Sequence, residues 1–187
     1  FEQLQFAWFP IFAKLEGATN VLRTGNKLLA AITLILDILK GYIPAAITLR
    51  YFPELIQFSC LITFFGHIFP IWLKFHGGKG VATYLGILFA ISLQLSFLFI
   101  FTWLVTSLIF KYSSISSLFA TLTVFVIYSI KKIIEPVFFK VLEKNLSSNL
   151  DSNNFTLLLF VFLILIIFTH RKNILNLKNR KEHKIKL

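Results

Sequence analysis

Long uncharged stretches limit what this chain can fold into more than any other feature of its sequence. Residues 81–110 contain no charged side chain, and residues 155–168 contain one polar side chain. Of the 187 residues, 57% are hydrophobic and 23 are phenylalanine, which is more than a soluble domain of this length needs for one core. The charges lie between the apolar runs instead of alternating with them at the period of a helix. The pattern therefore predicts an integral membrane protein.

The lengths of these runs predict an all-α fold, a polytopic membrane helical bundle that forms a single domain over residues 1–187. A helix needs about 20 apolar residues to cross a bilayer. Residues 81–110 are too many for one such helix, and the weak polar break at Ser92, Gln94 and Ser96 predicts two short or tilted helices instead. The six clear spans that we expect are residues 28–49, 55–73, two within 81–110, 118–130 and 155–168.

The N-terminus does not fit a complete span. Residues 1–12 are aromatic-rich, but they include Glu2 and Pro10 and are too short to cross a bilayer. They also lack the basic start, the initiating methionine and the small-residue cleavage site of a signal peptide. We therefore expect residues 1–16 to be an atypical or incomplete N-terminus with at most a vestigial seventh span.

Basic residues predict which ends of the spans face the cytoplasm. The formal net charge is +11, and the tail at residues 170–187 carries seven lysine or arginine residues. Counting spans back from a cytoplasmic tail places residues 14–27, 74–80 and 111–117 on the same side, with thirteen basic residues inside and five outside. The positive-inside rule agrees with this arrangement. The charge therefore indicates contact with an anionic lipid surface, and no nucleic-acid-binding motif accompanies it.

Residues 66–83 place a compact polar loop at the end of an apolar segment. Gly77, Gly78 and Gly80 have no Cβ, so their N–H groups can turn toward a ligand, and Lys79 adds a positive charge. The apolar residues from Val81 onward predict a helix whose N-terminus favours an anion. The spacing does not match the nucleotide-binding loop Gly-x-x-x-x-Gly-Lys-Ser/Thr. The loop indicates a phosphate site, and the competing interpretation is a flexible turn with one solvated lysine.

Other polar side chains near the apolar runs permit two interpretations each. Asp37 and Lys40 share one face of a predicted span, where they form either a mutual ion pair or a link to an active site. His67, near a helix end, is either a hydrogen-bonded structural residue or a catalytic one. The hydroxyl-rich segment at residues 111–117 either caps the next helix or binds a polar substrate.

Five short motifs occur in order along the chain. They are Gly-Ala-Thr-Asn-Val-Leu-Arg at residues 17–23, Asp-Ile-Leu-Lys-Gly at 37–41, the whole of 66–83, Lys-Tyr-Ser-Ser at 111–114 and His-Arg-Lys-Asn-Ile at 170–174. Together they resemble the bacterial acyl-phosphate:glycerol-3-phosphate acyltransferase family. The resemblance extends from residue 17 to about residue 182, and the order of the five motifs makes it specific.

The resemblance implies a seven-helix enzyme of the bacterial inner membrane, multi-pass with a cytoplasmic C-terminus. Such an enzyme moves a fatty acyl chain from acyl phosphate to the 1-hydroxyl of glycerol 3-phosphate and forms lysophosphatidic acid in phospholipid biosynthesis. Its partners are those two substrates and the bilayer, and the resemblance implies no metal, no cofactor and no coenzyme A. The alternatives are a catalytically impaired or inactive relative, and a small transporter of anionic solutes, for which only Asp37 and Lys40 qualify as pore-lining charges.

The resemblance also implies the residues of the site. The catalytic residues are then His170, Asn173, Arg23 and Lys79. Arg23 and Lys79 supply charge-assisted donors for two phosphates. His170 orients or deprotonates the attacking hydroxyl, unless it only marks where a helix meets the lipid headgroups. The substrate-binding residues are Gly17, Thr19, Asn20, Gly77, Gly78, Gly80, Thr83, Ser113, Ser114, Ser117 and Glu182.

Two segments depart from the family pattern. Residues 13–16 read Ala-Lys-Leu-Glu where the family has Ser-Gly-Asn-x, and residues 180–181 read Arg-Lys where it has Gly-Thr before Glu182. Ala13 and Leu15 lack the hydrogen-bond donors that they replace, and Glu16 places a negative charge beside the proposed anion site. We therefore expect the chain as written to be less active than an intact relative.

Overall fold

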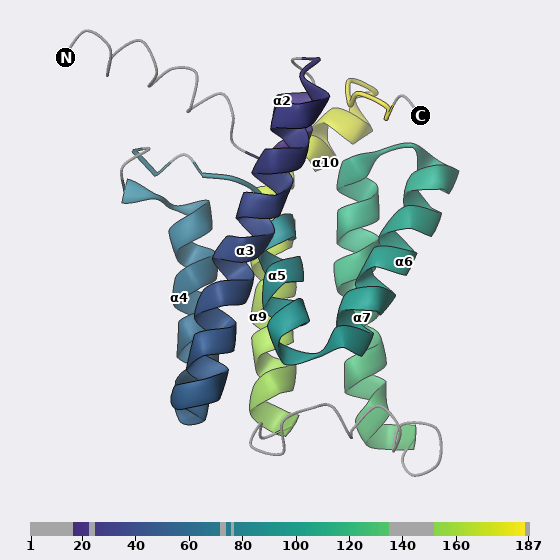
Figure 1. Ribbon diagram of the computed structural model, residues 1–187. Helices are drawn as coiled ribbons and strands as arrows, with labels where there is room; N and C mark the ends of the chain where they lie inside the picture. The colour runs from purple at the N-terminus through teal and green to yellow at the C-terminus, as the bar shows by residue number, and fades with distance from the viewer. Residues whose placement is uncertain (1–16, 23–24, 72–73, 76, 135–151, 186–187) are drawn as a thin grey trace, which may run out of the picture.

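The structure is a computed structural model, and it describes residues 17–22, 25–71, 74–75, 77–134 and 152–185. The elements within these residues are all helical: α2 (Ala18–Leu22), α3 (Lys27–Tyr51), η1 (Pro53–Leu55), α4 (Ile56–Ile68), α5 (Val81–Ile91), α6 (Leu93–Phe110), α7 (Ser113–Ile134), α9 (Ser152–Thr169) and α10 (Arg171–Lys178). The longer helices stand side by side as a bundle, and α2 and α10 lie at the same end of it (Figure 1).

Each of the six segments predicted to span the membrane contains a helix, but the helices differ in length. Among the described residues, α3, α6 and Ser113–Ile130 of α7 are long and apolar enough to cross a bilayer by length and composition. α9 and α10 add a fourth span if this pair, bent by 54°, is counted as one. α4 and α5 have 13 and 11 residues. The expectation of six clear spans is therefore not confirmed and stays a prediction.

The break predicted near Ser92 is present in the structure. α5 ends at Ile91, Ser92 has an extended backbone (φ −153°, ψ 111°), and α6 begins at Leu93. The Ser92 hydroxyl accepts a hydrogen bond from the Leu95 N–H at 3.4 Å and so caps α6. The chain reverses its direction at this point (Figure 1), so α5 and α6 are two helices rather than one long span.

Three of our expectations fall on residues that lie outside the described part of the chain. They concern the altered N-terminus at residues 1–16, the side chains of Asn20 and Arg23, and the basic residues counted on the outer side that fall within residues 135–151. The lower activity expected from residues 13–16 therefore stays a prediction.

Aromatic side chains join α4, α5, α6 and α9 in the core. Phe64, Tyr84, Phe99 and Phe162 are each at most 2% exposed. The Phe162 ring centroid lies 4.8 Å from that of Phe64 and 5.5 Å from that of Tyr84. The Tyr84 and Phe99 rings meet edge to face at 5.6 Å, a geometry that aromatic pairs favour. The outer faces of the helices instead expose large apolar side chains, as a lipid-facing surface requires, including Phe58, Ile62, Phe97 and Phe101.

Two glycines let α3 and α5 cross with their backbones in contact. A Cβ on Gly41 would overlap the Thr83 carbonyl oxygen of α5, and a Cβ on Gly86 would overlap the Ile38 carbonyl oxygen of α3. Because the obstructing atoms belong to the backbone, no side-chain rotation can relieve the overlap. The crossing therefore fixes the position of α5 against α3, and with it the position of the loop that precedes α5.

We expect Gly86→Ala to destabilise the protein, because its Cβ forces α3 and α5 apart. Overpacking of this kind costs about 1–3 kcal/mol. Gly66→Ala in α4 is the matched control, since a Cβ there meets nothing within 4 Å. Alanine is the better helix former, so this control should be neutral or stabilising by about 0.5–1 kcal/mol. Thermal unfolding in detergent measures both, and equal midpoints would contradict the close crossing.

Candidate active site

A cavity of about 650 Å³ lies at the end of the bundle where α2, α10 and the loop before α5 meet. Its walls come from segments far apart in the sequence, and several of these segments contribute polar residues. The predicted site residues that line it are Gly17, Thr19, Gly77, Gly78, Lys79, Gly80, Ser113, Ser117, His170 and Asn173. The fold thus brings most of the predicted residues into one space.

The other predicted residues lie elsewhere or outside the described side chains. Thr83 is fully buried in α5, and its hydroxyl has no hydrogen-bond partner among the described residues. Ser114 and Glu182 contact each other away from the cavity wall. The side chains of Asn20 and Arg23 are not described.

The glycine loop folds back against the end of α4. A Cβ on Gly77 would overlap the carbonyl oxygens of His67 and Ile68, so only glycine allows this approach. Gly80 has φ of +81°, a left-handed conformation that other residues rarely adopt, and it is the N-cap of α5. The first N–H groups of α5 are therefore at the cavity wall, where Val81 and Ala82 also lie. This confirms the predicted helix start directly after the loop.

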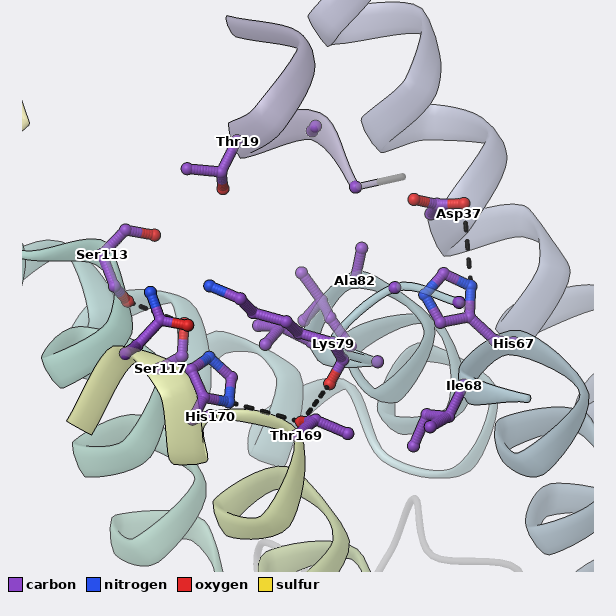
Figure 2. Close-up of a pocket in the computed structure, with 18 of the residues that line it drawn as sticks. Thr19, Asp37, His67, Ile68, Lys79, Ala82, Ser113, Ser117, Thr169 and His170 are labelled. Atoms are coloured by element: carbon purple, nitrogen blue, oxygen red, sulfur yellow. Dashed lines mark hydrogen bonds and ion pairs between the residues drawn. The ribbon is translucent and has the colours of Figure 1, made fainter. Parts of the chain in front are cut away.

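Lys79 belongs to this loop and reaches into the cavity. Figure 2 shows its ammonium group extended toward the open centre, on the side of Ser113 and His170. Its carbonyl oxygen accepts a hydrogen bond from the Thr169 hydroxyl at 3.0 Å. The last residue of α9 therefore holds the loop in place, although nothing in the sequence distinguishes Thr169 from other threonines in apolar runs.

His170 is a buried, neutral histidine at the base of the cavity. It follows the last residue of α9 and is 1% exposed, which does not fit a residue that simply meets lipid headgroups. Its Nδ1 lies 2.8 Å from the Ile166 carbonyl oxygen. Because a carbonyl can only accept, Nδ1 carries the proton and Nε2 is left as the acceptor. Burial, and to a smaller extent the Lys79 charge, lowers the pKa of His170 to about 4, so the ring is uncharged at neutral pH.

Asn173 lies one turn after His170 on α10 and is held from behind. Its amide nitrogen donates to Glu182 Oε1 at 2.6 Å, and the Ser114 hydroxyl donates to the same oxygen at 3.3 Å. The Ile185 N–H also donates to the Lys111 carbonyl at 2.7 Å, which ties the tail to the α6–α7 connection. Glu182 therefore orients Asn173 instead of lining the cavity itself.

Residues 113–117 of the hydroxyl-rich segment form the start of α7. Ser117 donates to the Ser113 carbonyl at 2.9 Å and accepts from Trp103 Nε1 at 3.2 Å. Ser116 likewise donates to the Tyr112 carbonyl at 2.9 Å. These two hydroxyls therefore bond to carbonyls one turn back, while the Ser113 hydroxyl points into the cavity in Figure 2.

The cavity has one polar and one apolar side. The apolar side chains come from α5 and α6, and they are Leu85, Phe99, Ile100, Trp103 and Leu104. The sequence did not single out these residues, because their hydrophobicity equals that of the lipid-facing residues beside them. Among the described residues, the polar side is lined by three cations, Lys79, Arg171 and Lys172, and by one carboxylate, Asp37. The cavity therefore suits a ligand with an anionic group and an apolar chain.

Comparisons with known proteins identify the same type of molecule. A model of the glycerol-3-phosphate acyltransferase family matches residues 13–180. A glycerol-3-phosphate acyltransferase of Pelagibacter ubique is 45% identical over 172 residues, which cover 91% of this chain and 79% of the relative. Another, of Wolbachia pipientis subsp. Culex pipiens, is 42% identical over 90% of this chain and 79% of the relative.

Two solved structures have the same fold. They are crystal structures of PlsY (YgiH), an integral membrane glycerol 3-phosphate acyltransferase, in its glycerol 3-phosphate form and its lysophosphatidic acid form. Each gives a TM-score of 0.75 at 34% identity over 91% of this chain, covering 78% and 79% of the PlsY chains. The all-helical bundle is therefore that of a multi-pass integral membrane protein.

The turn that carries Glu182 contains a residue in a glycine conformation. Arg180 has φ of +56°, its N–H bonds to the Leu177 carbonyl, and the next N–H, of Lys181, bonds to the Asn176 carbonyl. This is the Schellman arrangement, in which glycine is usual at the left-handed position. Arg180 stands where the resemblance implies a glycine, and it adopts the left-handed conformation that glycine favours.

We therefore expect Arg180→Gly to stabilise the protein by about 1 kcal/mol, since a non-glycine residue in this conformation costs about that much. Lys178→Gly, two residues earlier and inside α10, is the control and should destabilise by about 1 kcal/mol. Thermal unfolding in detergent compares the two variants. If both variants lower the midpoint of thermal unfolding, the backbone of Arg180 is not strained.

Proposed function

Because this chain belongs to the glycerol-3-phosphate acyltransferase family, we propose that it transfers a fatty acyl group from acyl phosphate to the 1-hydroxyl of glycerol 3-phosphate, forming lysophosphatidic acid for phospholipid synthesis. The observation that carries this proposal is a single cavity that combines a glycine loop with Lys79, the neutral His170 and an apolar wall. An acyl donor needs the apolar wall, and both substrates bring a phosphate that needs the cations.

We assign the phosphate of glycerol 3-phosphate to the loop at residues 77–80. The N–H groups at the start of α5 and the Lys79 ammonium group act on the same anion there, and charge-assisted bonds of this kind are about twice as strong as neutral ones. We assign the acyl phosphate to Gly17, Thr19, Asn20 and Arg23, with its chain against the apolar side of the cavity. Substrates held in this way meet between Lys79 and His170.

The transfer itself is a single displacement. The 1-hydroxyl oxygen forms a bond to the acyl carbonyl carbon, the bond from that carbon to the phosphate oxygen breaks, and inorganic phosphate leaves. Nε2 of His170, the unprotonated ring nitrogen, accepts the hydroxyl proton, and Asn173 lies one turn further on to orient the substrate. Acyl phosphate already has a good leaving group, so positioning and charge neutralisation suffice without a covalent enzyme intermediate.

We further propose that the helices cross the bacterial inner membrane six times with the cavity and the tail on the cytoplasmic side. α2 and α10, which contribute residues to the cavity, lie with the C-terminus at one end of the bundle in Figure 1, and this agrees with the excess of basic residues counted for that side. Water-soluble glycerol 3-phosphate would then enter from the cytoplasm, while the acyl donor would enter from the bilayer.

Replacement of Lys79 tests the function. Lys79→Ala should lower transfer by at least ~1.5–3 kcal/mol, roughly 10- to 100-fold, because a charged donor to the substrate phosphate is lost. The assay uses membranes with acyl phosphate and glycerol 3-phosphate, normalised to the amount of inserted protein. Lys178→Ala, an exposed lysine outside the cavity, is the control and should retain activity. An active Lys79→Ala protein would mean that the loop is only a turn.

Cysteine labelling in intact cells tests the orientation. In a variant without Cys60, a cysteine at position 149 should react with an impermeant maleimide, whereas a cysteine in place of the exposed His183 should react only after the cells are opened. The reverse pattern would overturn the proposed topology.

A further inference from the structure

Asp37 is a buried carboxylate on an apolar helix, and two side chains face it. It is 4% exposed in the first half of α3. Lys40 Nζ lies 3.1 Å from its Oδ1, but the Lys40 side chain is 62% exposed and so points largely outward. The second neighbour is His67 of α4, whose Nδ1 lies 3.8 Å from the same oxygen while its side chain is only 9% exposed. Both interpretations left open for Asp37 thus describe real contacts, an ion pair and a link toward the cavity.

His67 stands between this carboxylate and the glycine loop. Figure 2 shows the imidazole with one nitrogen toward Asp37, beside the loop that leads to Lys79. A Cβ added to Gly78 would overlap Nε2 on the opposite edge of the ring, so Gly78 packs directly on the imidazole. Asp37, His67 and Gly78 therefore form one continuous contact from α3 to the loop.

We propose that Asp37 and His67 are positioning residues for the phosphate loop. Asp37 fixes the orientation of the imidazole, and the imidazole is the surface on which Gly78 rests. The inference rests on the proposed function, in which residues 77–80 hold the phosphate of glycerol 3-phosphate. Neither residue needs to touch the reacting atoms.

The placement of the loop explains why such a support matters. On one side, Gly77 abuts the end of α4 and Gly78 abuts His67; on the other, the Thr169 hydroxyl holds the Lys79 carbonyl at 3.0 Å. Removal of the imidazole leaves the loop held at Gly77 by the end of α4 and at Lys79 by Thr169, but Gly78 between them loses its support. Displacements of about 1 Å in binding groups cost up to about 100-fold in rate or affinity, so a small shift of Gly78 and Lys79 is enough to weaken phosphate binding.

Kinetic analysis of His67→Ala in membranes tests the proposal. We expect the KM for glycerol 3-phosphate to rise roughly tenfold, with a smaller change in kcat per folded molecule and in the KM for acyl phosphate. Asp37→Asn keeps the size of the side chain but removes its charge, and should shift the same KM less. Ser59→Ala is the matched control, since it removes a 2.8 Å hydrogen bond to Thr48 across the same α3–α4 interface, remote from the loop. It should leave the KM unchanged.

A double-mutant cycle tests the contact itself and needs no activity. Gly78→Ala should lower the midpoint of thermal unfolding in the presence of His67, because its Cβ overlaps Nε2, and should cost much less in the His67→Ala background, where the space is empty. Equal costs in both backgrounds, or an unchanged KM for His67→Ala, would overturn the proposal. If the unmodified chain shows no transfer at all, the proposed function fails, and the unfolding cycle still decides whether His67 supports the loop.

Discussion

Contact between backbones at glycine positions is the constraint on which the rest of this structure depends. Gly41 and Gly86 let α3 and α5 cross without an intervening side chain, and Gly77 lets the loop before α5 touch the carbonyls at the end of α4. In a membrane, helices gain little from hiding apolar side chains from lipid, so close packing and polar contacts must hold them together. The same close packing sets the first turn of α5 beside the cavity, so the glycines that build the bundle also build the site.

The cavity combines two basic groups that need different charge states. In the proposed reaction, Lys79 binds an anion, whereas His170 must stay uncharged to accept a proton. Burial resolves this conflict, because the ring is 1% exposed and the low polarity around it disfavours the imidazolium form. The Ile166 carbonyl then selects the tautomer, so that the accepting nitrogen is Nε2. The chemistry of one histidine is thus set by the end of the helix that precedes it.

The location of the cavity at one end of the bundle fits the two proposed substrates, one soluble in water and one in the bilayer. Its cations come from the loop before α5 and from α10, which lie near that end, while its apolar wall comes from the bodies of α5 and α6. Leu104 contributes to this wall and is 49% exposed on the outer face of the bundle. A chain of methylene groups can therefore lie against α6 while a phosphate stays near water.

The sequence by itself determined the helices and the family, since both depend on local patterns. Apolar runs specified where helices form, and the polar residue Ser92 specified the break between α5 and α6, because these features act on neighbouring residues. The ordered motifs identified the family, and most of the site residues that they implied line the cavity. The sequence determined helix length less well. The apolar run predicted a span over residues 55–73, but α4 ends at Ile68, against which the glycine loop folds back.

Only the tertiary structure decided which of these polar residues meet and what each one does. Glu182 lies nine residues after Asn173 and 68 after Ser114, and no spacing rule predicts that one carboxylate oxygen bonds to both. The Thr169 hydroxyl holds the carbonyl of Lys79, a residue 90 positions earlier in the chain. His67 of α4 contacts both Asp37 of α3 and Gly78 of the loop before α5. These contacts depend on how the helices cross. The crossing is set by backbone contacts at glycines, and a pattern of polar and apolar side chains does not show which glycines make such contacts.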